Sequence, residues 1–427
     1  MTTATDAPPP RFAWMVTGLV ALALLVRLAV VFAVGPPSLL VHDELAYRWG
    51  TEGAAPWKRW LPFIECRPPG YLLFLHGLSR LHGDARWLLS VQALVSALAI
   101  VPLVALGRAW VGWRAALVAA AILALYPLHV GYAALFMSET LYVTLLLTAL
   151  ALLFRRDAAR GVTIAAGVAF AAACLVRGVP TPFIAVVLLW AMLGGWWDGR
   201  EGVRRAGAFA LGIVLLLGPW TARNVAVIGE PIVTDCQTMY NLWQGNNAVG
   251  WNQVLARRYW EHSTSPTERE AFAREKVLAY VGRDPVGWIR QKVHDQMPML
   301  FGRADVIHGR LLSRDRFGAL SERAEATLLG ASRLAWLFVG ALGIAGLILL
   351  PRDPRRTLVL LFCAFVVCVH VIGFARERHR LPLVPWLALG VGVMLVRPTG
   401  AWQPTPARLV VATVLAAAVA ALVVTSG

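Results

Sequence analysis

Residues 12–34 read FAWMVTGLVALALLVRLAVVFAV, an apolar run in which Arg27 is the single charged side chain. A membrane-spanning helix needs about 20 predominantly apolar residues, and this run is longer than the apolar core of a signal peptide. We therefore predict a first membrane helix that is retained. A charge inside such a helix is costly, so we expect Arg27 to face a partner, with a phosphate headgroup or snorkelling to the surface as the two interpretations.

The composition extends this prediction to the whole chain. Of the 427 residues, 58% are apolar and the mean hydropathy is +0.62, whereas soluble domains have about 45–50% apolar residues. The sequence predicts an all-α polytopic membrane protein with roughly eleven transmembrane helices. Further spans are expected to begin near Trp87, Ala115, Thr140, Gly161, Thr181, Ala206, Ala331, Thr357, Leu381 and Leu409.

The net charge of +16 is concentrated in short loops on alternate sides of these spans. Arginine-rich short loops mark the cytoplasmic side of membrane proteins, so this charge sets the topology and indicates no nucleic-acid partner. The N-terminus is then inside, and residues 35–86 and 225–330 are outside. The arginines that decide this are Arg108, Arg114, Arg155, Arg156, Arg160, Arg200, Arg204, Arg205, Arg352, Arg355, Arg356, Arg397 and Arg408.

The topology divides the chain into three parts. Residues 1–224 form an N-terminal transmembrane module that includes a first outer loop at 35–86, residues 225–330 form an extracytoplasmic helical domain, and residues 331–427 form C-terminal transmembrane helices. Two helix starts are expected in the middle part, a capping box at 265–268 and a second start at 284–285. We find no internal repeat, which argues against a transporter built from two related halves.

The five cysteines have no metal-binding spacing. Cys66 and Cys236 fall in the two outer segments, where the compartment permits disulfides. A disulfide between them is a further hypothesis.

An acidic pair follows the first span, in HDELAY at residues 42–47. Asp43 and Glu44 are candidates for a general base and an orienting group or metal ligand. Together with Glu65 they are the candidates for holding a divalent metal ion, the one cofactor that we consider. The alternative is a helix N-terminus, where acidic side chains favour the helix dipole.

Basic side chains at outer span ends are the next candidates. Arg67 and Tyr71 belong to RPPGY at residues 67–71, a rigid turn that enters an apolar stretch. Arginine binds phosphate through bidentate contacts, and the alternatives are a plain loop-to-helix entry and snorkelling. Arg177 also lies at an outer span end. The other candidates in this group are Arg223, Arg376, Arg378, His379 and Arg380.

Amide and aromatic side chains alternate in NLWQGNN at residues 241–247. Amides bind sugar hydroxyls and aromatic rings stack on sugar CH faces, whereas the Gly-Asn-Asn sequence is also a strong turn signal. The candidate sugar-binding residues here are Asn241, Trp243, Asn246 and Asn247.

The order of these motifs resembles the GT-C membrane glycosyltransferases, and most closely the bacterial relatives of protein O-mannosyltransferases and of the lipid A aminoarabinose transferase. The resemblance extends roughly from the first span to the tenth. It rests on HDELAY at 42–47, RPPGY at 67–71, PWTARN at 219–224, NLWQGNN at 241–247 and RHRLP at 378–382. Two departures are His379, where relatives often have tyrosine, and Cys66, where some have glutamate.

The resemblance implies transfer of a sugar from a polyprenyl-phosphate donor to a glycan, lipid or protein acceptor, by inverting displacement on the extracytoplasmic face of the bacterial inner membrane. Asp43 would be the base and Glu44 would assist it, while Arg67, Arg378 and Arg380 would hold the lipid phosphate. Membrane lipids are the other expected partners. No Walker A loop or Rossmann glycine pattern is present, as expected for an enzyme without a nucleotide donor.

Two alternatives from other classes stay open. A lipid or sugar transporter or flippase would have polar residues near span centres and broken helices. A membrane assembly factor without catalysis would use the outer segment for docking. Changing Asp43 to asparagine separates the enzyme from both, because only an enzyme loses turnover while it still folds.

Overall fold

Helices are the only regular elements in the part of the chain that the computed structural model describes, which is 7–33, Glu44, Tyr47, 67–193, Gly195, Trp197, 199–250, 253–302, 321–396 and 405–425. The helices are α1 (Phe12–Ala33), α5 (Gly70–Ser79), α6 (Ala85–Leu98), α7 (Ile100–Trp110), α8 (Trp113–Leu125), α9 (Pro127–Ala133), α10 (Glu139–Leu153), α11 (Arg160–Val176), α12 (Phe183–Leu193), α13 (Gly199–Ile228), α14 (Thr238–Gly245), α15 (Gln253–His262), α16 (Pro266–Arg283), α17 (Pro285–Gln291), η2 (Lys292–Gln296), α18 (Met297–Phe301), α21 (Glu322–Leu349), α22 (Pro354–Ile372), η3 (Glu377–Leu383), α23 (Val384–Val396) and α24 (Pro406–Thr425).

The expected membrane helices are confirmed as apolar helices at the expected places. Within the described residues, seven helices are long and apolar enough to cross a membrane, and α8 with α9 forms one more candidate that is bent by 52°. Three shorter apolar helices, α10, α11 and α12, coincide with the remaining expected spans. The chain is therefore a multi-pass membrane protein, and the number of crossings stays a prediction.

Small residues set how closely the membrane helices approach. A Cβ atom on Gly167 of α11 would overlap the backbone of α13 at Phe209 and Gly212, and one on Gly346 of α21 would overlap Gly390 of α23. Close backbone contact through small residues is a main source of helix association in lipid, where burial of apolar surface contributes little. These two pairs therefore hold the bundle that supports the outer elements.

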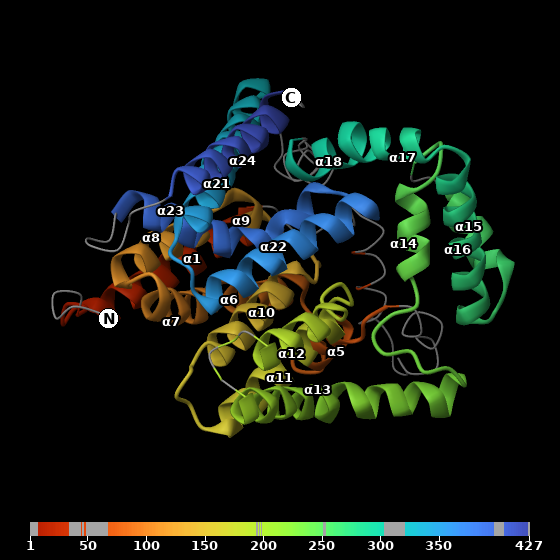
Figure 1. Ribbon diagram of the computed structural model, residues 1–427, viewed down its shortest axis with the longest axis horizontal. Coiled ribbons are helices and arrows are strands. Elements are labelled where there is room, and N and C mark those ends of the chain that lie inside the picture. Colours follow the sequence, from red (N-terminus) through yellow and green to blue (C-terminus); the bar gives the residue numbers. More distant parts are fainter. Residues whose placement is uncertain are drawn as a thin grey trace.

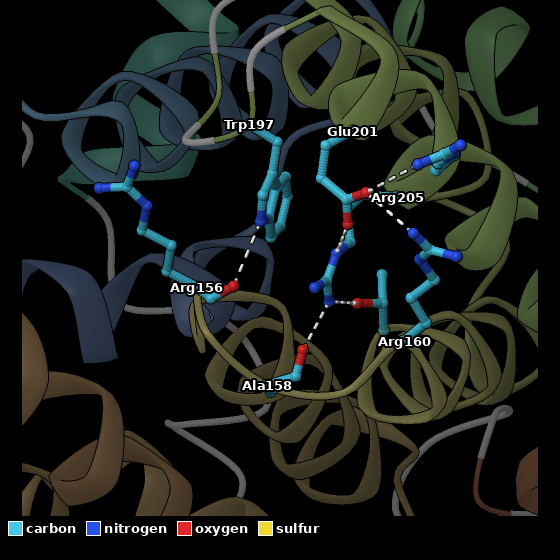
Figure 2. A network of polar contacts seen from close by, with 8 residues as sticks. Arg156, Ala158, Arg160, Trp197, Glu201 and Arg205 are labelled. Carbon is cyan, nitrogen blue, oxygen red and sulfur yellow. Dashed lines mark hydrogen bonds and ion pairs between the residues drawn. The ribbon is translucent and has the colours of Figure 1, made fainter.

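Two sets of polar contacts brace the side that we expect to face the cytoplasm (Figure 2). Glu201 near the start of α13 pairs with Arg160 at 3.0 Å and with Arg205 at 2.8 Å. The Trp197 indole donates to the carbonyl of Arg156 at 3.2 Å. These contacts tie the turn between α10 and α11 to the start of α13.

The charged side chain within the first span has an internal partner. Arg27 is fully buried and donates to the carbonyls of Ala124 at 2.8 Å and Leu123 at 3.1 Å, and to Ser96 at 2.9 Å. Pro127 lacks the N–H that would continue α8, so carbonyls at this bend need another donor. Arg27 therefore caps a broken membrane helix, and neither the phosphate nor the snorkelling interpretation holds for it.

Helices α14, α15 and α16, from the segment that we expect outside, gather at one end of the molecule, on the right of Figure 1 and far from the N-terminus. Both expected helix starts are confirmed. The Ser265 side chain accepts from the N–H of Glu268, and the Asp284 side chain accepts from the N–H of Gly287. A small separate hydrophobic core lies here, made of Tyr240, Trp243, Leu255, Tyr259 and Ala273.

Candidate functional site

The acidic segment after α1 is anchored by Glu44, whereas Asp43 lies outside the described residues. Glu44 is fully buried, and its Oε1 accepts the backbone N–H of Phe136 at 3.0 Å, in the turn between α9 and α10. Tyr47 packs its ring edge-on against Tyr71, with the ring centroids 4.7 Å apart. Two separate elements therefore hold Glu44 and Tyr47.

The turn at Arg67 lies against the same segment. The Arg67 guanidinium is 5.7 Å from the centre of the Tyr47 ring, and Tyr71 is fully buried in the first turn of α5. Gly70 lies so close to the end of α11 that a Cβ atom there would be 2.8 Å from the carbonyl of Leu175. The glycine is needed for this approach, which brings the turn beside the residues that end α11.

A buried charged cluster begins at that point. Arg177, just after α11, pairs with Glu139 at 2.7 Å. Arg378 reaches the same carboxylate oxygen at 3.8 Å. The rings of His370 and His379 stack at 4.0 Å beside them. Four segments that are far apart in sequence therefore place two arginines, two histidines and a carboxylate together.

This cluster lines a small, partly open recess. Within the described residues, Glu139 Oε2, the Tyr142 hydroxyl and His379 Nδ1 are buried in its lining without a hydrogen-bond partner. Buried polar atoms are almost always hydrogen-bonded in native proteins. The recess is therefore built to hold a polar or charged group.

The Tyr71 hydroxyl connects the recess to the acidic segment. Burial raises its pKa well above the ordinary value, and the charges of Tyr47, Glu139 and Glu44 raise it further. Both carboxylates therefore disfavour the ionised form of this hydroxyl.

Asp235 reaches this site from the loop before α14. Its carboxylate lies over Gly178, next to Arg177, where any side chain on the glycine would overlap it. Burial raises the pKa of Asp235, while hydrogen bonds from Gln237 and Thr238 and the charge of Arg177 act in the opposite direction. The outer loop thus contributes a second carboxylate beside Arg177.

The neighbouring Cys236 is disulfide-bonded, and Cys174, Cys363 and Cys368 are free thiols. Its expected partner, Cys66, lies outside the described residues, as does Glu65. No group of three metal-ligating side chains comes together within the described residues, so a metal site that includes Asp43 and Glu65 stays a prediction.

The arginines of the late basic motif have different surroundings. Arg380 is buried, pairs with Glu377 at 2.9 Å and donates to the carbonyl of Phe301 at 3.1 Å. Arg376 lies over the Phe374 ring at 4.8 Å. Of the residues predicted to bind phosphate here, the structure brings Arg378 and His379 into the recess and gives Arg380 a bracing position.

The amides of the predicted sugar-binding motif are engaged within the protein. Asn246 Nδ2 donates to the carbonyl of Ile372 at 2.8 Å, and Asn246 Oδ1 accepts the Trp288 indole N–H at 2.6 Å. Asn247 Nδ2 donates to the carbonyl of Trp243 at 2.7 Å. These contacts dock α14 on α17 and on the end of α22.

Two further predicted residues lie outside the recess lining. Asn241 is exposed on α14. Arg223 donates to Asn224 at 2.9 Å and lies over the Trp220 ring at 5.2 Å. Sugar or phosphate binding by these residues, and by Trp243, Asn246 and Asn247, stays a prediction.

Sequence reasoning missed three contributors, Glu139, Asp235 and His370, and named Arg177 only as an arginine at a span end. A signal existed for Glu139, because it is the single charged side chain of α10. Asp235 and His370 had no such signal, because they reach the site through tertiary packing.

Comparison with known proteins supports both the sequence resemblance and the fold. Residues 66–220 match the family described as dolichyl-phosphate-mannose-protein mannosyltransferase, a GT-C family. The archaeal oligosaccharyltransferase AglB from Archaeoglobus fulgidus, solved with an inhibitory peptide and a dolichol-phosphate, superposes with a TM-score of 0.51 over 98% of this chain, at 14% identity. Residues 66–220 therefore match a GT-C family, and the fold of the chain is similar to that of the GT-C glycosyltransferase AglB.

The coverage of this GT-C relative is partial. The chain spans 56% of the length of the AglB structure. ArnT from Cupriavidus metallidurans, solved with undecaprenyl phosphate, aligns with 91% of this chain and 79% of its own at 17% identity and a TM-score of 0.42. No curated protein matches the sequence.

Proposed function

We propose that the protein transfers a sugar from a polyprenyl-phosphate carrier to an acceptor hydroxyl, with inversion at the anomeric carbon. The observation that carries this proposal is the recess in which Arg177 and Arg378 flank Glu139, together with Tyr71, whose ring packs against Tyr47 at the end of the acidic motif. An arginine pair suits a phosphate leaving group, and an adjacent carboxylate segment suits activation of a hydroxyl.

In this mechanism Asp43 accepts the proton of the acceptor hydroxyl as its oxygen attacks the anomeric carbon. The bond from that carbon to the phosphate oxygen breaks, and the polyprenyl phosphate leaves with the electron pair. Arg67 and Arg378 hold the departing phosphate as charge develops on it. Glu139 orients Arg177 for the same task, while Glu44 fixes the acidic segment through Phe136.

The lipid-phosphate donor has support from the relatives. The matching family is described by a dolichyl-phosphate-mannose donor, and the AglB structure contains a dolichol-phosphate. We extend the polyprenyl-phosphate part of this chemistry to the present chain, for a hexose or a pentose. The acceptor is a hydroxyl of a glycan, a lipid or a protein.

We place the site on the extracytoplasmic face of the bacterial inner membrane. The arginine-rich short loops support this topology. The disulfide at Cys236 adds support, because disulfides persist in oxidising compartments. In this arrangement residues 1–224 and 331–427 are the transmembrane parts, and 225–330 is the outer helical domain.

Asp43→Asn tests the proposed function. Purified protein in detergent is given a panel of polyprenyl-phosphate sugars that carry radiolabel, and lipid-linked label is followed with time. Removal of a general base typically lowers the rate about 10²–10⁴-fold, so we expect transfer to be lost while donor binding persists. Asp157→Asn, an exposed acidic residue between α10 and α11, is the matched control and should retain full activity. Full activity of Asp43→Asn would contradict the assigned base.

The bend between α8 and α9 is the observation that favours the alternative, a lipid or sugar transporter, because transporters often use broken helices at their sites. Protein that binds a donor without turning it over, and that moves the donor across liposome membranes, would support the transporter instead.

A further inference from the structure

Gln92 is a fully buried amide on α6 that bonds to two separate elements. Its Nε2 donates to the carbonyls of Leu135 at 2.6 Å, Ala133 at 3.1 Å and Tyr132 at 3.2 Å, at the end of α9. Its Oε1 accepts the hydroxyl of Tyr71 at 2.5 Å. The carbonyls can only accept, so the amide orientation is fixed and both of its ends are used.

Each of these elements holds one end of the acidic segment. The N–H of Phe136, directly after the carbonyls that Gln92 binds, donates to the buried Glu44 carboxylate. The ring of Tyr71 packs edge-on against Tyr47. One side chain therefore joins the support of Glu44 to the support of Tyr47.

We propose that Gln92 is a positioning residue that sets the distance between the acidic segment and the arginine recess. The proposal rests on the proposed function. Reaction rates depend steeply on this distance, since a misplacement of about 1 Å costs roughly 10²-fold. Without the amide, the carbonyls at the end of α9 lose their donor and Tyr71 loses its acceptor, so both supports are released together.

Ser96 provides a matched control. It lies one turn further along α6, is nearly as buried, and makes its hydrogen bond to Arg27 at the bend before α9. Loss of the Ser96 hydroxyl therefore removes a buried polar contact from the same helix face. It leaves the contacts to Glu44 and Tyr47 intact.

The test compares the kinetics of Gln92→Met and Ser96→Ala in folded, full-length protein. We expect kcat of Gln92→Met to fall about 10–100-fold with the KM for donor within twofold, and kcat of Ser96→Ala to stay within twofold. If Gln92→Met does not fold, Gln92→Glu keeps the size and the acceptor for Tyr71 but loses the donor. Unchanged kcat in a folded Gln92 variant would overturn the proposal.

A double variant separates positioning from general loss of stability. Tyr71→Phe removes the hydroxyl that binds Gln92 and keeps the ring that packs on Tyr47. Because both changes act on one connection, the combined loss in Gln92→Met/Tyr71→Phe should be smaller than the product of the single losses. A fully multiplicative loss would contradict a shared role.

Hydrogen exchange provides a readout that needs no substrate. Exchange of the Phe136 amide should accelerate in Gln92→Met and stay at the wild-type rate in Ser96→Ala. Wild-type protein that turns over no donor would contradict the proposed function, and the exchange result would still decide the positioning role. Unchanged protection of Phe136 in folded Gln92→Met would overturn it.

Discussion

Arg378 and Arg380 are two residues apart and have opposite surroundings. Arg378 reaches Glu139 at the recess, at 3.8 Å. Arg380 points to the other side of η3, where it pairs with the buried Glu377 and lies 4.4 Å from the centre of the Trp336 ring. Because both side chains extend from one tight helical turn, they point in different directions. Arg378 faces the recess, and Arg380 stabilises the fold.

This difference predicts opposite phenotypes. Arg378→Ala should weaken donor binding about 10–100-fold, the equivalent of one or two charge-assisted hydrogen bonds, and leave thermal stability near wild type. Arg380→Ala should destabilise the protein by about 3–5 kcal/mol, because the buried Glu377 loses its ion pair with Arg380. Donor titration and thermal unfolding of both variants check this. A larger loss of donor affinity in Arg380→Ala than in Arg378→Ala would contradict the assignment.

For single residues, the sequence predicted which residue types suit a binding site, but it did not predict where their side chains point. A dense run of arginines at an outer span end indicated an anion site, but side-chain directions depend on the turn that η3 makes. The amides of Asn246 and Asn247 show the same limit. Their pattern suits sugar binding, yet they satisfy carbonyls whose positions only the tertiary structure sets.

Among the elements, the π-helical turn η2 joins the outer helices to the membrane bundle. Lys292 is buried in it and donates to the carbonyl of Gly245 at 2.7 Å, at the end of α14. Gln296 accepts the N–H of Ala375 at 2.8 Å, just before the arginine motif. Burial lowers the pKa of Lys292 to about 8, with Asp295 acting in the opposite direction.

This pKa predicts how stability changes with pH. The unfolded chain keeps the Lys292 proton up to the ordinary pKa of 10.5, while the folded protein releases it near 8. Between these values the unfolded state binds more protons than the folded state. The free energy of unfolding should therefore rise by about 2–3 kcal/mol as the pH increases from 8 to 10.5, and this gain is lost when the pH is lowered to 8 again. Thermal unfolding from pH 7 to 10.5 measures this.

Lys292→Met should flatten that rise in stability, whereas Lys276→Met should leave it intact, because Lys276 is partly exposed and pairs with Glu275. A pH dependence that persists in Lys292→Met would assign it to another group.

The positions of helices could be predicted from the sequence where they depend on local features, such as the length of an apolar run or a capping residue. Apolar length located the membrane helices, and the serine and aspartate caps located the starts of α16 and α17. The break between α8 and α9 was not predicted, although Pro127 stands at it. A proline alone permits a bend, and this one is stabilised by Arg27 of α1, which donates to the carbonyls of Leu123 and Ala124.

For the molecule as a whole, the arrangement of charge predicts which end faces outward. Arginines gather in the turns near Arg160 and Glu201, while the disulfide at Cys236 lies near the recess. Figure 1 shows α14, α15 and α16 at the end opposite the N-terminus, which agrees with an outer position for these helices.

Thiol labelling of intact cells tests this orientation. In a Cys368→Ser background, a cysteine at the exposed Thr264 between α15 and α16 should react with an impermeant maleimide. A cysteine at the exposed Asp157 should react only after lysis. Labelling of the second position in intact cells, with the first protected, would invert the topology.

The capping of α8 by Arg27 places a constraint on biosynthesis. The chain between Arg27 and Ala124 is 97 residues long, and at about 5–20 residues per second its synthesis takes roughly 5–20 s. During this interval α1 carries a charge whose carbonyl partners on α8, Leu123 and Ala124, have not yet been made. The insertion machinery must therefore shelter α1 until α8 arrives, and a nascent chain that stops before α8 carries a membrane-embedded charge that quality-control proteases can detect.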